Sequence, residues 1–191
     1  QYNTIGYDGA SSAILTSSAS SISWQHTTGT GNDRILLAAV DVFNSGGTPT
    51  TVTSITYDGV ALTQVATAVY STSPQVRSYV YRLINPSSGT KTITVNFAAS
   101  TLAVGGSVTY TNVNQTNPVQ TSNYATGSGT SQSVSVTASG SYSKRLYGHL
   151  GSYRTSSYTV TEGTGQTNRW AQTGSNHKGR GSDKSVTSGS V

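Results

Sequence analysis

The stretch from Thr51 to Ala66, TVTSITYDGVALTQVA, decides the fold class. Two runs rich in β-branched residues, Thr51–Tyr57 and Val60–Ala66, flank the dipeptide Asp58-Gly59. A two-residue type I′ turn needs positive φ at both central positions, and Asp-Gly is among the pairs that supply it most readily. The stretch therefore predicts a β-hairpin whose turn is formed by Asp58 and Gly59.

Runs of the same kind recur along the chain at intervals of about 8–12 residues, separated by Gly, Asn, Ser and Pro, which is typical of a β-sandwich. Lys91–Phe97 alternates apolar and polar residues, as a strand with one buried face does. Arg34–Phe43 is apolar on both faces, which predicts a central strand covered on two sides. Weaker strands are expected at Ser131–Ala138, Leu146–Arg154, Tyr158–Glu162 and Asn168–Thr173.

Composition narrows the class of protein further. Of the 191 residues 63 are Ser or Thr, only 9% are charged, and there is no Cys or Met. The missing Cys excludes disulfide scaffolds and thiol catalysis, and no apolar run is long enough for a transmembrane helix. Low charge, abundant hydroxyl groups and a start at Gln1 without an initiator Met lead us to expect an exported protein.

The domain plan has three parts: an N-terminal extension over 1–20, a single sandwich domain over 21–175, and a polar basic tail over 176–191. The whole net charge of +5 lies in residues 141–191, whereas residues 1–140 are neutral. The basic residues are spread among Gly, Ser and Tyr, which disfavours a nucleic-acid surface. The tail has the composition of a flexible segment, and residues 1–20 are polar and β-prone, so they are the best candidate for a donor strand.

Catalytic and metal sites find little support. Glycoside hydrolysis needs two facing carboxylates, but the chain has one Glu and five scattered Asp. The isolated His26, His149 and His177 lack metal-ligand spacing, and no Gly-x-Ser-x-Gly elbow is present. We therefore expect a non-enzymatic protein without cofactor or metal, and a structural, half-buried role for His26.

Tyrosine is the unusual residue, with 12 copies. Tyr combined with basic residues is typical of protein interfaces, and exposed rings also stack on sugars. The candidate interface or glycan-stacking residues are Tyr142, Tyr147, Tyr153, Tyr158 and Trp170. Filling half-buried sheet surfaces is the alternative role for these tyrosines. Asn114, in Asn114-Gln115-Thr116, is a candidate glycosylation site.

Several blocks of the chain resemble a widespread class of bacterial and phage surface β-sandwich domains. The matching blocks are Ser23–Thr27 with Arg34–Leu37, Val52–Thr63, Leu83–Thr90, Val108–Pro118 and Gly163–Trp170. The resemblance covers roughly residues 20–175. It implies a jelly-roll-like sandwich in exported or virion-associated proteins, and it implies no catalytic residues. Residues 142–149 and 184–191 depart from the apolar strands of the class.

The sequence thus predicts an all-β protein, a jelly-roll-like antiparallel β-sandwich at the cell surface or on a virion. Its expected partners are copies of itself, assembled into a filament, sheath or particle shell, with residues 1–20 or 174–191 pairing across a subunit boundary. Two alternatives stay open: a carbohydrate-binding or adhesin module that binds surface glycans, and a virion decoration or fibre protein.

Overall fold

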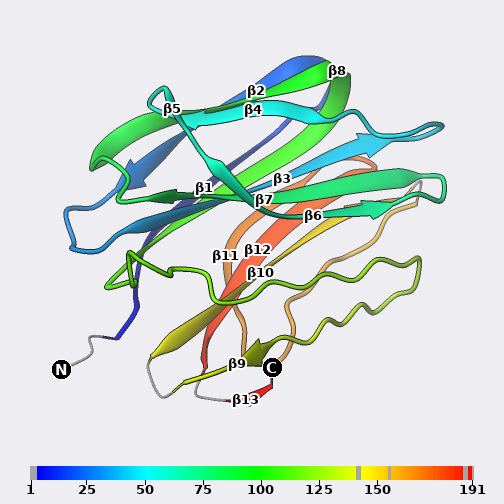
Figure 1. Ribbon diagram of the computed structural model, residues 1–191. Coiled ribbons are helices and arrows are strands. Elements are labelled where there is room, and N and C mark those ends of the chain that lie inside the picture. The colour runs from blue at the N-terminus through cyan, green and yellow to red at the C-terminus, as the bar shows by residue number, and fades with distance from the viewer. Residues whose placement is uncertain (1–3, 141–142, 155, 187–188, 191) are drawn as a thin grey trace.

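The computed structural model describes residues 4–140, 143–154, 156–186 and 189–190. These residues form an antiparallel all-β sandwich, in one domain, with no helix among them (Figure 1). None of them forms a helix long and apolar enough to cross a membrane. The predicted all-β sandwich is confirmed, and it carries a third layer that the sequence did not predict.

Two sheets share one long strand, β8 (Gly89–Thr111). Its first part pairs with β2 and β4, and its second part with β1 and β3. The first sheet has the order β2 (Ala19–Thr28), β8, β4 (Val52–Tyr57), β5 (Val60–Ala61). The middle sheet has the order β1 (Gly6–Ile14), β8, β3 (Ile35–Asn44), β7 (Gln75–Ile84), β6 (Thr63–Tyr70).

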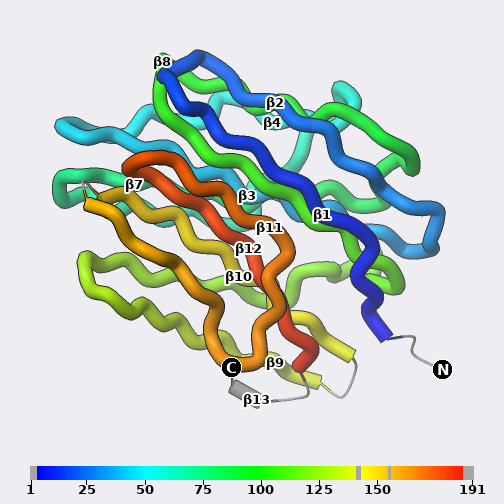
Figure 2. The backbone as a smooth tube through the Cα atoms, turned by 180° about the vertical axis from the view of Figure 1, so that it is seen from behind, coloured from blue at the N-terminus to red at the C-terminus, as the bar shows by residue number. Residues whose placement is uncertain are grey.

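A third sheet covers the other face of the middle sheet, behind it in Figure 1 and in front of it in Figure 2. Its order is β10 (Lys144–Tyr153), β12 (His177–Val186), β11 (Thr167–Thr173). A small separate pair joins β9 (Thr137–Ala138) to β13 (Gly189–Ser190).

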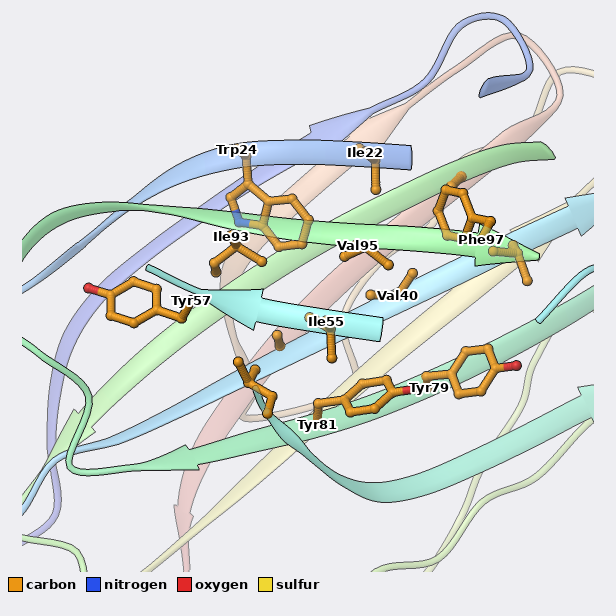
Figure 3. Close-up of a cluster of buried hydrophobic side chains, with 14 of the residues drawn as sticks. Ile22, Trp24, Val40, Ile55, Tyr57, Tyr79, Tyr81, Ile93, Val95 and Phe97 are labelled. Atoms are coloured by element: carbon orange, nitrogen blue, oxygen red, sulfur yellow. The ribbon is translucent and has the colours of Figure 1, made fainter. Parts of the chain in front are cut away.

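The main core lies between the first and middle sheets (Figure 3). It holds alternate residues of each strand: Ile22, Trp24, Ile55, Tyr57, Ile93, Val95 and Phe97 from the first sheet, and Leu36, Ala38, Val40, Val42, Tyr79, Tyr81 and Ala103 from the middle sheet. The opposite face of β3 contributes Ile35, Leu37, Ala39 and Phe43 to clusters under the third sheet. The prediction that this strand is covered on both sides is confirmed, since every residue from Ile35 to Phe43 is buried.

The turn at Asp58-Gly59 is confirmed, with φ of 52° and 80°. The second arm of the hairpin is shorter than expected. Of the residues expected in this arm, Val60–Ala61 alone pair with β4. The backbone N–H of Leu62 then bonds Ile55 O at 3.0 Å, and the chain crosses to the middle sheet as β6. Repetitive β-branched sequence does not reveal this change of sheet, because both arms are strand.

Parts of both predicted end segments belong to the sheets. Most of the expected N-terminal extension is β1, which pairs with β8 of the same chain from Gly6 to Ile14. The expected tail contains β12, the central strand of the third sheet, which pairs with both β10 and β11. Pairing of either segment across a subunit boundary stays a prediction.

Candidate assembly surface

The sequence makes Trp170 a candidate for an exposed ring that binds a partner or a sugar. The structure instead buries this side chain. It lies inward on β11 with 3% of its surface exposed, and its Nε1 donates to Tyr147 Oη at 3.0 Å. Two glycines make room for the indole: a Cβ on Gly106 or on Gly181 would lie 2.2 Å or 2.1 Å from ring atoms of Trp170. The third sheet therefore docks on the middle sheet around this side chain.

The candidate tyrosines do not form one surface. Tyr147 is held by its bond to Trp170, and burial raises the pKa of its hydroxyl. Tyr153 packs against Phe43 with ring centroids 6.1 Å apart. Tyr158 lies on the outer side of the third sheet, where its hydroxyl is 2.9 Å from Ser152 Oγ. Tyr142 lies outside the described residues.

A hollow of about 250 Å³ separates the segment around Tyr158 from the outer face of the third sheet. Its lining residues are Leu150, Thr159, Val160, Gln172, Thr173, Lys178, Gly179 and Arg180. The two cations are already engaged, since Lys178 Nζ donates to Tyr158 O and Arg180 pairs with Glu162 at 2.8 Å. Both cations that line the hollow therefore already have partners within the chain.

The remaining sequence candidates lie in exposed turns. Asp58 is paired with Lys91 at 2.8 Å, beside the turn that it forms with Gly59. Asn114 is exposed, and its Oδ1 accepts bonds from the backbone N–H groups of Thr116 and Asn117, each at 2.9 Å. Its surroundings are open to solvent, as a modification site requires.

One buried carboxylate lies between the middle and third sheets with a histidine and a serine. Asp41 on β3 is fully buried, and its Oδ1 binds both Ser78 Oγ at 2.5 Å and His149 Nε2 at 3.0 Å. A Cβ on Gly151 would lie 2.2 Å from the same oxygen, so a glycine leaves the space for this carboxylate. A nucleophilic triad places the imidazole between the hydroxyl and the carboxylate. Here the carboxylate is in the middle, so the serine is not bonded to the base that would activate it.

A second buried acid, Asp183 on β12, holds the other end of the third sheet. It pairs with Arg145 at 3.1 Å and Arg169 at 2.9 Å, and it accepts a bond from Tyr110 Oη at 2.5 Å. Burial alone would raise the pKa of Asp183, but the bonds from Arg169, Tyr110 and Arg145 outweigh it and hold the pKa below its ordinary value. Sequence reasoning missed this cluster, although Asp183 stands out there as an acid among basic residues.

His26 is fully buried rather than half-buried. It is 1% exposed, with Nδ1 at 2.9 Å from both Ser11 Oγ and Ser107 Oγ and Nε2 at 2.5 Å from Thr109 Oγ1. Burial lowers its pKa to about 4, with Asp8 opposing the shift. Across the described residues, no three His, Asp or Glu side chains come close enough together to hold a metal ion.

The middle sheet has an open outer edge at β6. In the part of the chain that the structure describes, β6 pairs with β7 only, so its other edge presents unpaired N–H and C=O groups. Thr63–Tyr70 contains no charged residue and no Pro, and the bulge near its start leaves Ala66–Tyr70 in regular register. Native edge strands are usually blunted by charge, Pro or bulges against pairing with other chains. Sequence reasoning could not identify this edge, because strand order does not follow from the local pattern.

Comparison of the chain with protein-family models, with curated proteins and with solved structures found no match.

Proposed function

We propose that this protein is a non-enzymatic extracellular structural subunit, which assembles with copies of itself through the open β6 edge of the middle sheet. Strand addition to such an edge forms main-chain hydrogen bonds without any requirement for a deep pocket. The single observation that carries the proposal is an eight-residue edge strand with no charge and no Pro.

The side-chain chemistry supports a structural role. The buried acids each make one bond between the middle and third sheets, Asp41 with His149 and Asp183 with Tyr110. Removing one partner of a buried pair leaves an uncompensated charge and is strongly destabilising, so these contacts bear on stability. The low fraction of charged residues and the many hydroxyl groups support the extracellular setting.

The test is the oligomeric state of the purified chain over a series of concentrations, measured by sedimentation velocity and by electron microscopy. Thr67→Lys places a charge on the exposed edge strand β6, and we expect it to hold the protein as monomers. Thr92→Lys is the matched control, because Thr92 is exposed on β8 between β2 and β4, where no edge is open. Assembly of wild type and Thr92→Lys but not of Thr67→Lys supports the proposal. A wild-type chain that stays monomeric at its highest soluble concentration overturns it.

A further inference from the structure

A long arm connects β8 to β9. Residues 119–136 run outward and return, and every residue from Gln120 to Ser135 is exposed (Figure 1). Asn123 Nδ2 donates to Ser135 O at 2.9 Å and ties the two halves of the arm together. Two large side chains of the arm, Tyr124 and Val134, are 62% and 47% exposed.

The returning half of the arm has the sequence of a strand without the pairing of one. Ser131, Ser133 and Ser135 alternate with Gln132, Val134 and Val136, the period of two that suits a half-buried strand. The sequence predicts a strand over Ser131–Ala138, but the structure pairs only Thr137–Ala138. Among the described residues no backbone–backbone hydrogen bond involves 119–136. Loops of this length in compact domains are commonly functional.

We propose that residues 130–136 of one copy add as a strand to the β6 edge of a neighbouring copy; this inference rests on the proposed function. Both segments are uncharged, so pairing them desolvates no ion. Their lengths agree, since seven extended residues span about 23 Å and β6 has eight residues. Val134 and Val69, which is 37% exposed, would both lose exposed apolar surface.

The donor arm and the acceptor edge are different parts of the surface, so each copy uses one site as donor and the other as acceptor. Two copies that exchange arms form a closed two-fold dimer. Copies that each donate to the next form a ring when the rotation closes and an open filament when it does not. In each case the partner is a second copy of this chain.

Cysteine cross-linking tests the pairing directly, because the natural chain contains no Cys. Val134→Cys protein mixed with Thr67→Cys protein should form a disulfide-linked heterodimer under mild oxidation, several-fold faster than Val134→Cys mixed with Thr92→Cys. Equal rates in the two mixtures would refute the inference.

Proline variants separate this inference from the proposed function. Adjacent strand residues direct their N–H groups to opposite edges, so the double variant Val134→Pro, Ser135→Pro removes one donor that faces the acceptor strand. We expect it to raise the concentration needed for assembly at least tenfold, whereas Ser128→Pro at the tip of the arm should assemble normally. If Thr67→Lys blocks assembly but the double variant does not, another segment is the donor and only the inference fails. If wild type does not assemble, both fail.

Discussion

Acid should destabilise this protein through His26 well before its carboxylates titrate. The imidazole is enclosed between the first and middle sheets by hydroxyl groups of Ser11, Ser107 and Thr109, and Trp24 Nε1 donates to Ser107 at 2.9 Å in the same network. Hydroxyl groups can hydrogen-bond to a neutral imidazole as well as to a charged one, and the attraction of Asp8 offsets only part of the cost of burying the charged form. Folding therefore keeps His26 neutral.

The magnitude follows from the shift in pKa from 6.5 to about 4. Because the folded pKa lies below the unfolded one, the unfolded chain binds the proton first, and stability falls as the pH drops below about 6.5. Each pKa unit corresponds to about 1.36 kcal/mol, so the full loss approaches about 3 kcal/mol near pH 4. Between pH 8 and pH 5 the expected loss is about 2 kcal/mol.

The assay is urea denaturation from pH 8 to pH 5, followed by tryptophan fluorescence, for wild type and for His26→Gln. Burial also lowers the pKa of His177, so part of the pH dependence remains in the variant. The difference between the two proteins isolates His26, and we expect the wild type to lose about 2 kcal/mol more than the variant over this range. If the free energy of unfolding changes between pH 8 and pH 5 by amounts that differ by less than about 0.5 kcal/mol in the two proteins, burial does not hold His26 neutral.

Two further substitutions test how the third sheet is attached. Gly106→Ala should destabilise the protein by about 1–3 kcal/mol, because its Cβ would lie 2.2 Å from Trp170. Gly148→Ala is the control, because its Cβ would meet nothing within 4 Å, and it should be neutral or slightly stabilising in the same urea denaturation experiment. Asp183→Ala should cost about 3–5 kcal/mol, because it leaves Arg145 and Arg169 without their buried partner. Lys91→Ala, which removes an exposed ion pair with Asp58, should change the stability far less than Asp183→Ala does, and equal effects of Asp183→Ala and Lys91→Ala would contradict the structure.

Local signals in the sequence were sufficient for part of the fold. Asp58-Gly59 specifies its turn through backbone geometry alone, and the unbroken apolar run of β3 specifies burial on both faces. These features depend on residues close together in the chain. The candidate site depends on contacts between distant parts of the chain. Trp170 is buried because Gly106 on β8 and Gly181 on β12 leave space for its ring, and neither contact can be read from the residues next to Trp170.

The largest difference from the sequence prediction concerns β12, which reads as a flexible tail because all of its residues except Val186 are His, Lys, Gly, Arg, Ser or Asp. Its inward positions are His177, Gly179, Gly181 and Asp183. Gly179 and Gly181 bury no side chain, but they let Val104 and Trp170 approach the strand closely. A strand stabilised by the side chains of its neighbours has no hydrophobic period of its own, and pattern reasoning cannot find it.

The glycine pair Gly105-Gly106 shows how three layers fit on one strand. Adjacent residues of a strand face opposite sides, and here a Cβ on Gly105 would lie 2.4 Å from Trp24 while one on Gly106 would lie 2.2 Å from Trp170. Trp24 thus packs on one face of β8 and Trp170 on the other, and Trp170 joins the third sheet to the sandwich.

On one side of the three layers β1 lies against both β2 and β11. On the other side the chain passes from β5 into β6, which among the described residues pairs with β7 only. The same layering therefore places β6 at an edge of the middle sheet, where we propose that a second copy pairs.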